Sequence, residues 1–301
     1  MSGSEPVAST LTNQEIIIGT FAVTGSASGM GAQAAERLRA LGHTVIGVDL
    51  KDADVIADLS TPEGRRAAGS RVLELSENRL DGAVMAAGIG PGAGADRARL
   101  IAQINYLGVV ELLTAWRPAM ATAGNAKVVV LASNSTTTTP GVPSRTVRAL
   151  LAGDADKATR STRLFGPGAS AIMYAGSKIA VSRWVRRSAV TPEWAGKGIR
   201  LNALAPGAIM TPLLQAQLDS PREGKAVRNF PIPTGGFGDP GHLADWIVFM
   251  LSDAAEFLCG SIIFVDGGTD AYFRPTGWPQ AIPLRGAPRY LWRFLRFRKL
   301  R

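Results

Sequence analysis

The chain is poor in the residues that build metal centres and covalent crosslinks. Its 301 residues include one cysteine, Cys259, and two histidines, His43 and His242. A single thiol excludes an internal disulfide and a cluster of several thiolates around zinc. Two isolated histidines give little support for a Ser-His-Asp triad or a histidine-rich metal site. The sequence therefore predicts no metal site and assigns any chemistry to other residue types.

Long apolar runs are also lacking. No stretch of about 18 uninterrupted apolar residues occurs, so no membrane-spanning helix is expected. Residues 1–15 are small and polar, without the basic start and apolar run of a secretory signal. We expect a cytoplasmic protein.

Acidic residues are missing from the C-terminal segment. Residues 285–301 contain seven basic residues and no acidic one. They supply +7 of the net charge of +9, which leaves +2 on residues 1–284. A body so nearly neutral argues against a nucleic-acid partner.

Between residues 16 and 266, short apolar runs alternate with helical patterns. The apolar runs predict strands at residues 16–23, 43–48, 55–57, 82–87, 128–132, 199–204 and 262–265. The helical patterns cover residues 32–41, 62–75, 98–121, 170–190, 211–218 and 242–251. This alternation predicts an α/β fold, a single Rossmann-type, doubly wound parallel sheet with helices on both faces.

A glycine-rich turn, Thr24-Gly-Ser-Ala-Ser-Gly-Met-Gly31, follows the first predicted strand. Glycine lets the backbone turn tightly and approach a ligand closely. The helix that follows offers free N–H groups and a positive dipole to a pyrophosphate. The residues expected to bind a dinucleotide here are Gly25, Ser28, Gly29, Met30 and Gly31.

Asp49 ends the second predicted strand, 18 residues after Gly31. A carboxylate there accepts hydrogen bonds from the adenosine ribose and repels a 2′-phosphate, so NAD is favoured over NADP. Lys51 is close enough to keep NADP as a minor alternative.

Residues after the next two predicted strands extend the expected cofactor groove. Asp58 and Leu59 follow the short third strand and are expected to flank the adenine. Ala87 and Gly88 follow the fourth, and their small size lets a cofactor lie close to it.

Tyr174 and Lys178 lie four residues apart in Tyr174-Ala-Gly-Ser-Lys178. On a helix, this spacing puts both side chains on one face. A neighbouring ammonium lowers the pKa of a phenol from its ordinary value near ~10, which makes a general base. Many helices carry the same pair by chance, so its weight depends on the rest of the chain.

Taken in order, the motifs of the chain resemble those of the short-chain dehydrogenase/reductase family. They are Thr24-Gly-x-x-x-Gly-x-Gly31, Asp58, Ala87-Gly88, Asn105, Ser133, Tyr174-x-x-x-Lys178, Pro206-Gly207 and Asp266-Gly-Gly268. Each motif is weak alone, and the combination is specific. The resemblance covers residues 15–270.

Longer segments resemble one branch of that family, the bacterial 3α-hydroxysteroid dehydrogenases/carbonyl reductases. They include residues 55–64, Thr211-Pro-Leu-Leu-Gln215 and Arg274-Pro-Thr276. The 41-position gap between Ser133 and Tyr174 resembles this branch too, since most members of the family have a shorter one.

The resemblance implies a catalytic tetrad. Tyr174 is the implied acid/base, and Ser133 the implied hydrogen-bond partner of the substrate oxygen. Lys178 is expected to lower the pKa of Tyr174 and to hold the nicotinamide ribose, so this pair also counts as cofactor-binding. Asn105 is expected to hold a water in a proton relay.

The segment after the sixth predicted strand is expected to pass the nicotinamide at Pro206 and Gly207. The backbone of Ile209 and the hydroxyl of Thr211 are candidates to bind its carboxamide. Residues 211–237 are expected to form a mobile substrate loop with a hinge at Gly235-Gly236.

The expected domain organisation is one catalytic domain, residues 1–273, with an insert at 134–169 and a basic extension at 274–301. The insert should border the mouth of the cleft and influence substrate choice. The resemblance implies a homo-oligomer, a dimer or tetramer.

The extension alternates basic with aromatic and aliphatic residues. Drawn as a helix, it has one side with Leu291, Phe294, Leu295 and Arg298, and another with Arg289, Arg293 and Arg296. This pattern is typical of an interfacial helix on anionic lipid. A solvated or partner-packed extension and a nucleic-acid contact are the alternatives.

The expected function is NAD-dependent interconversion of a hydrophobic secondary alcohol and its ketone, with a hydroxysteroid as the leading substrate. One alternative is an aryl or terpenoid alcohol dehydrogenase of the same family. The alternative from another class is a protein that binds NAD without turnover, which the complete tetrad disfavours.

Overall fold

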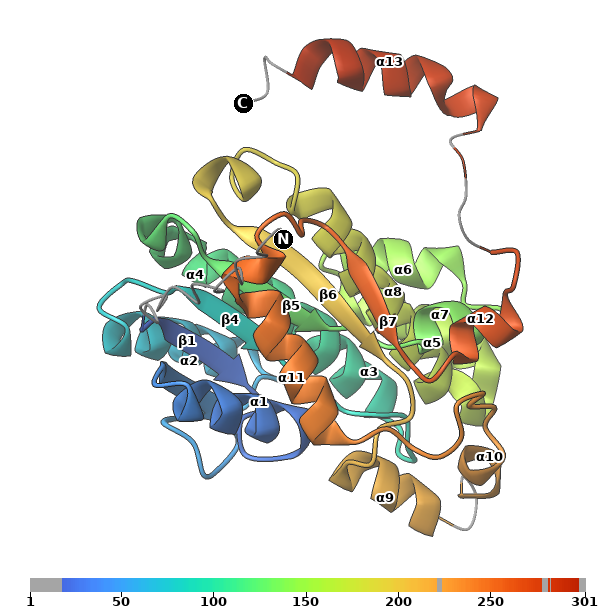
Figure 1. Cartoon of the computed structure of the whole chain (residues 1–301). Helices are drawn as coiled ribbons and strands as arrows, with labels where there is room; N and C mark the ends of the chain where they lie inside the picture. Colours follow the sequence, from blue (N-terminus) through green and yellow to red (C-terminus); the bar gives the residue numbers. More distant parts are fainter. Residues whose placement is uncertain (1–17, 221–223, 278–280, 282, 298–301) are drawn as a thin grey trace, which may run out of the picture.

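A seven-stranded parallel sheet forms the centre of the computed structural model, which describes residues 18–220, 224–277, 281 and 283–297 (Figure 1). The strand order is β3-β2-β1-β4-β5-β6-β7, so the chain winds outward in both directions from the middle of the sheet. The strands are β1 (Thr20–Thr24), β2 (Thr44–Asp49), β3 (Val55–Ile56), β4 (Gly82–Met85), β5 (Lys127–Leu131), β6 (Arg200–Pro206) and β7 (Ile262–Val265). The expected doubly wound α/β fold is confirmed.

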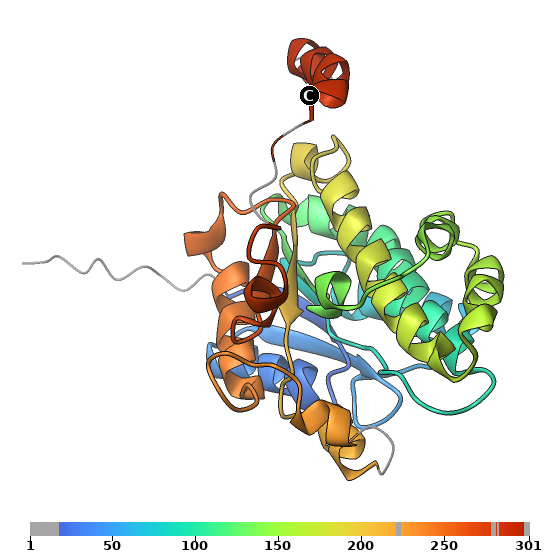
Figure 2. The same cartoon turned by 90° about the vertical axis from the view of Figure 1, so that its right-hand side faces the viewer.

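Two layers of helices cover the sheet, as the turned view of Figure 2 shows. One layer holds α1 (Gly29–Ala40) and α11 (Pro240–Leu251). The other holds α2 (Pro62–Leu75), α4 (Val109–Ala123) and α8 (Ala169–Ser188). Strand residues alternate between the two cores: Val128 and Val130 face one, and Val129 and Leu131 face the other. Burial on both faces explains why β5 reads as a continuous apolar run.

Three helices begin with a polar cap followed by proline. The Thr61 hydroxyl caps α2 before Pro62, the Thr211 hydroxyl caps α9 (Pro212–Asp219), and the Asp239 carboxylate caps α11 before Pro240. The side-chain oxygen satisfies a free N–H of the first turn, and proline supplies the helical φ. Each cap, together with the proline after it, fixes the residue at which its helix begins.

Three predicted elements differ from the structure. The first strand begins at Thr20, because Gly19 and the exposed Ile18 precede the paired residues; residues 16 and 17 lie outside the described part. The predicted helix 98–121 is α3 (Arg97–Ala102) and α4 joined by a π-helical turn, Gln103–Gly108. Within residues 211–237, α9 agrees with the helix predicted at 211–218, whereas the short helix α10 (Gly224–Arg228) was not expected.

The insert is largely helical. It consists of α5 (Ser135–Thr138), α6 (Ser144–Leu151), α7 (Ala155–Thr162) and a 3-10 segment, Arg163–Gly168. Helices α6 and α7 pack on α8, where Val147 and Leu150 are buried. At the contact, a Cβ on Gly176 would lie 3.2 Å from a methyl of Thr146. Helices α6 and α7 therefore cover α8, while the start of the insert, at Asn134, Ser135, Thr138 and Thr139, lines the pocket that also contains Ser133 and Tyr174.

The chain ends in two short helices. Helix α12 (Thr269–Phe273) lies against α5, and its N-terminus is held by the Asp266 carboxylate, which accepts from the N–H groups of Gly268 and Asp270. Helix α13 (Ala287–Arg296) stands apart from the body in both views (Figures 1 and 2).

Replacing Trp116 by alanine tests the packing of α4 on α2. Trp116 is fully buried, and its Nε1 donates to the carbonyl of Gly69 over 3.2 Å. The expected loss in the free energy of unfolding is about 3–5 kcal/mol, since a large cavity forms and a buried carbonyl loses its partner. Urea denaturation measures it. Trp292→Ala on the exposed helix α13 is the control, and an equal loss in both variants would contradict the assignment.

Candidate active site

Parallel strands end at one edge of the sheet, and the candidate site lies along this carboxyl edge, as in other open α/β sheets. Two adjoining pockets occur there, of about 200 Å³ and about 600 Å³. Met30, Thr211 and Leu213 line both, so the two form one groove.

The turn between β1 and α1 is built from close backbone contacts. Gly25 has φ +70°, and a Cβ on it would lie 2.8 Å from the backbone nitrogen of Ala87. A Cβ on Gly31 would lie 2.1 Å from the carbonyl oxygen of Gly25. A side chain at either position would collide with the backbone, so glycine is required to form this cradle. Ser28 is the N-cap residue of α1, yet its hydroxyl makes no capping hydrogen bond and lines the pocket.

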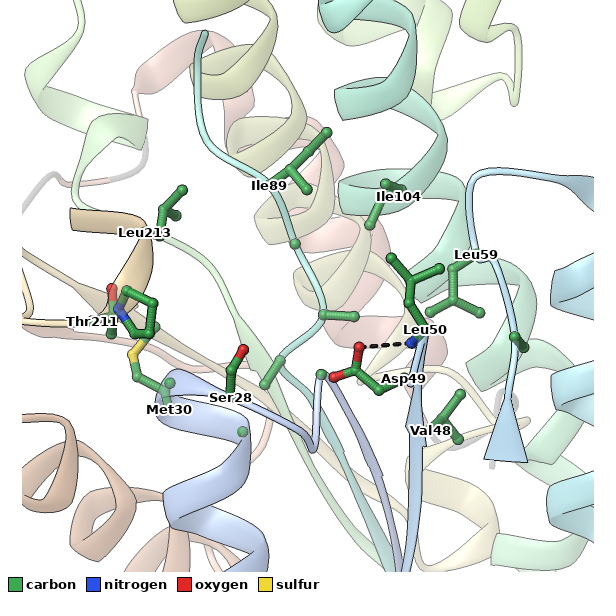
Figure 3. A pocket seen from close by; sticks show the side chains of 18 of the residues that line it. Ser28, Met30, Val48, Asp49, Leu50, Leu59, Ile89, Ile104, Thr211 and Leu213 are labelled. Atoms are coloured by element: carbon green, nitrogen blue, oxygen red, sulfur yellow. Dashed lines mark hydrogen bonds between the residues drawn. The ribbon is translucent and has the colours of Figure 1, made fainter. Parts of the chain in front are cut away.

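Asp49 lies at the end of β2 and faces the smaller pocket (Figure 3). One carboxylate oxygen accepts from the Ala27 N–H over 2.9 Å, and the other from the Leu50 N–H over 2.7 Å. These bonds hold the carboxylate against the glycine-rich turn. The remaining lone pairs are available to hydroxyl donors of a ligand.

The smaller pocket gathers most of the residues expected to bind a cofactor. Figure 3 shows Asp49 and Leu59 toward one end and Met30 and Thr211 toward the other. The expected residues that line it are Gly25, Ser28, Gly29, Met30, Gly31, Asp49, Asp58, Leu59, Ala87, Gly88 and Thr211. Several apolar lining residues were not expected from the sequence: Val48, Leu50, Ile89, Ile104 and Leu213. They lie next to the motifs, but in the sequence they are ordinary apolar residues that nothing marks as pocket lining.

The larger pocket contains the hydroxyls of Ser133 and Tyr174, which are hydrogen-bonded to each other. Ser133 follows β5, and Tyr174 projects from α8, so a strand end and a helix bring them together. Pro206, Gly207, Ile209 and Thr211 line the same pocket, as expected.

Two polar atoms beside these hydroxyls were missed in the sequence. Asn134 Nδ2 and Ser135 Oγ are buried and have no hydrogen-bond partner among the described residues, and both residues line the larger pocket. A buried polar atom without a partner is unfavourable, so a bound ligand with matching groups would be stabilised there. Their position directly after Ser133 was the available signal.

Lys178 is buried beneath the site and lines neither pocket. Its ammonium donates to the Leu131 carbonyl over 2.6 Å and lies 5.9 Å from the centre of the Tyr174 ring. It also lies behind Gly88, where a Cβ would be 3.9 Å from Nζ. The expected neighbourhood of Tyr174 and Lys178 is present, with a backbone carbonyl as the nearest partner of the ammonium.

Burial controls the pKa values of this pair. Burial raises the pKa of Tyr174, and the hydrogen bond with Ser133 offsets part of the rise. Burial lowers the pKa of Lys178 from 10.5 to about 8. Burial thus sets the direction for Tyr174 in the protein by itself, and the expected lowering of its pKa by Lys178 stays a prediction.

Asn105 lies in the π-helical turn and is almost fully buried. Its Oδ1 accepts from the Ile89 N–H and its Nδ2 donates to the Ile89 carbonyl, each over 2.9 Å. These two bonds hold the loop after β4 and occupy both polar atoms of the Asn105 side chain. A π-helical turn shifts the hydrogen-bond register, which leaves a main-chain carbonyl outside the regular ladder.

Other classes of site find no support in the described part of the chain. Residues 18–220, 224–277, 281 and 283–297 contain no group of three His, Cys, Asp or Glu side chains arranged to hold a metal ion. Within the same residues, no helix combines the length and the apolar character needed to cross a bilayer.

Comparison with known proteins identifies the family. The model of the NAD dependent epimerase/dehydratase family matches residues 21–207, and that of enoyl-(acyl carrier protein) reductase matches residues 158–270. The 3-alpha-hydroxysteroid dehydrogenase/carbonyl reductase of Comamonas testosteroni is 39% identical over 254 residues, which cover 84% of this chain and 97% of that protein. The chain belongs to the short-chain dehydrogenase/reductase family.

Two further relatives of this family are informative. The crystal structure of the 3-alpha-hydroxysteroid dehydrogenase from Pseudomonas sp. B-0831 complexed with NADH is 43% identical, with a TM-score of 0.80 over 85% of this chain and 99% of that one. The cis-4-hydroxycyclohexanecarboxylate dehydrogenase of Sinomonas cyclohexanicum is 30% identical over 83% of this chain and 95% of that protein. The expected family, fold and oxidoreductase class are confirmed.

The buried lysine generates a test on stability. Between pH 8 and 10.5 the unfolded chain keeps the proton that folded Lys178 has released, so the wild type gains stability as pH rises. Lys178→Met removes the buried ammonium and should unfold with a larger free energy than the wild type. This difference should shrink by up to about 3 kcal/mol across that pH range. Below pH 8 both states are protonated and the difference should stay constant.

Urea denaturation at pH values between about 7 and 10 measures this change. Lys157→Met, at an exposed lysine, gives the background pH dependence of a lysine replacement. A difference between wild type and Lys178→Met that matches this background would show that the burial of Lys178 does not control its protonation.

Proposed function

We propose that the chain is an NAD-dependent dehydrogenase that interconverts a hydrophobic secondary alcohol and its ketone. The observation that carries the proposal is the pair of hydroxyls, Ser133 and Tyr174, in a pocket that continues into a glycine-lined groove. The cradle at Gly25 and Gly31, the uncapped Ser28 hydroxyl and the Asp49 carboxylate fit the pyrophosphate and ribose of NAD.

Bound NAD supplies the hydride acceptor, a chemistry that no side chain provides. The residues of the chain hold the alcohol and move its proton. Ser133 and Tyr174 orient the carbinol oxygen, which fixes distance and angle before reaction. In oxidation the phenolate form of Tyr174 would accept the hydroxyl proton, while the hydride with its two electrons would be taken up by bound NAD. Ketone reduction reverses both transfers.

Lys178 and Asn105 complete the proposed tetrad. Lys178 binds the nicotinamide ribose when its ammonium is free to leave the Leu131 carbonyl, and its charge then favours the Tyr174 phenolate. Because the Asn105 side chain is tied to Ile89, a relay water would bind the main chain of the π-helical turn. Ile209 and Thr211 remain the proposed partners of the carboxamide.

The substrate that we propose is a hydroxysteroid or another bulky cyclic alcohol. The larger pocket, of about 600 Å³, is lined by apolar Leu213, Leu214 and Val227 and by Phe230. These residues lie on α9, on α10 and just beyond it, within the segment proposed as the substrate-binding element with a Gly235-Gly236 hinge. The names of the relatives support a cyclic secondary alcohol, which also covers the aryl and terpenoid alternatives.

We further propose a cytoplasmic homo-oligomer, a dimer or tetramer, as the working form. The catalytic domain spans residues 1–273, and the extension 274–301 makes peripheral contact with anionic membranes. We propose no nucleic-acid partner, because residues 1–284 carry a net charge of only +2.

Tyr174→Phe tests the acid/base role. The substitution keeps the ring and removes the titrating hydroxyl, so kcat should fall by about 10²–10⁴-fold while NADH binding stays unchanged. Initial rates on a panel of steroid and aromatic secondary alcohols, read at the absorbance of reduced nicotinamide, measure it. The exposed Tyr272 lies outside both pockets, and Tyr272→Phe is the control. Retained turnover in Tyr174→Phe would refute the role.

Asp49→Asn tests the choice of cofactor. It removes the charge that repels a 2′-phosphate and keeps one of the two oxygens that accept from the backbone, so the ratio of kcat/KM for NAD over NADP should fall by about tenfold or more, equivalent to ~1.4 kcal/mol. Asp52→Asn removes the same charge three positions further along, in exposed surface, and should leave the ratio unchanged. An unchanged ratio in both variants would remove Asp49 from the cofactor site.

A further inference from the structure

Helix α13 carries its basic residues on one face. Arg289, Arg293 and Arg296 are spaced four and three residues apart, which aligns them along the helix. The helix contains no acidic residue, and neither does the rest of the segment 285–301, whose charge is +7. We call these three residues the arginine face.

The opposite side of α13 is apolar. This apolar face consists of Tyr290, Leu291, Phe294 and Leu295, each between 52% and 69% exposed. Tyr290 and Phe294 stack with ring centres 6.4 Å apart, so the aromatic part of the face is continuous. Large apolar side chains gathered on one exposed face are typical of an interaction surface.

Trp292 marks the boundary between the two faces. Its ring lies 5.1 Å from the guanidinium carbon of Arg296 and is half exposed. An indole beside a cation has an apolar body and a polar edge, which suits the level of lipid headgroups. The helix thus presents charge, an amphipathic aromatic and apolar side chains in that order around its axis.

A proline-containing spacer connects α13 to the body. Thirteen residues, 274–286, separate it from α12, and three of them are prolines. Such a spacer reaches at most about 45 Å when extended. The body end is anchored, because Arg274 pairs with Asp270 over 2.8 Å and Asp266 caps α12.

Charge distinguishes between the possible occupants of this surface. A second copy of the chain offers another +7 segment and a body of +2, so it provides no net negative charge for the arginine face. An anionic bilayer offers negative headgroups for the arginines and acyl chains for the apolar face at the same depth.

We propose that α13 is an interfacial helix that docks the enzyme on an anionic bilayer. The helix lies in the plane of the headgroups, with the apolar face toward the acyl chains, Trp292 at the boundary and the arginine face toward phosphate groups. This docking does not depend on the chemistry proposed for the active site, so the two are tested separately.

Flotation of the full-length protein with vesicles tests the proposal. One set contains equimolar phosphatidylcholine and phosphatidylserine, and the other phosphatidylcholine alone. The protein should float with the anionic set, and the truncated chain 1–284 should not. Replacing the arginine face with Arg289→Gln, Arg293→Gln and Arg296→Gln should weaken binding on the order of 100-fold. Raising the salt from about 0.1 M to about 1 M should also release the protein.

A matched variant removes three arginines from the body. Arg66→Gln, Arg71→Gln and Arg99→Gln change the net charge equally at exposed positions far from α13 in the sequence, and should leave flotation unchanged. Burial of Trp292 should shift its fluorescence to the blue on anionic vesicles, and Trp292→Phe should abolish that shift.

Three results would overturn the proposal. They are equal flotation of the full-length and 1–284 chains, equal loss of binding in the two triple variants, and a lower oligomeric mass of the 1–284 chain by light scattering without any vesicle binding by the full chain. The last result would assign the helix to a second copy. Turnover in solution should be the same for the full-length and 1–284 chains, which separates failure of docking from failure of the proposed reaction.

Discussion

Parallel pairing of the seven strands is the constraint on which the rest of the structure depends. It brings the end of every strand to one edge, so Gly25, Asp49, Gly88, Ser133 and Pro206 meet although they are far apart in the sequence. The five inner strands, β2, β1, β4, β5 and β6, are each hydrogen-bonded to two neighbours and largely buried on both faces, which holds that edge rigid. The pockets lie where side chains from strand ends and helix starts leave space.

Much of this arrangement could be predicted from the sequence, because its signals are local. β-branched runs such as residues 128–130 predict buried strands, and a threonine or aspartate before proline predicts a helix start. A glycine-rich turn after a strand predicts a ligand cradle. The least accurate predictions concern the start of the first strand, the π-helical turn inside the predicted helix 98–121, and α10. Strand pairing sets the first of these, and no local pattern marks the other two.

Other features of the site depend on contacts distant in sequence. Spacing placed Lys178 next to Tyr174, but the partner of its ammonium is the Leu131 carbonyl, 47 positions away. The same holds for the Asn105 side chain, which binds the Ile89 backbone. Burial then raises one pKa and lowers the other, and no local pattern records how deeply a side chain is buried.

The contact between the insert and α8 also limits how the chain can be altered. A Cβ on Gly176 would make a tight contact of 3.2 Å with the Thr146 methyl, and the buried Val147 and Leu150 cover the adjoining surface. A loop transplanted from a relative with a short gap would expose bare helix backbone and an apolar strip beside Tyr174. The insert and α8 cover each other's surfaces, so engineering of either requires redesign of both.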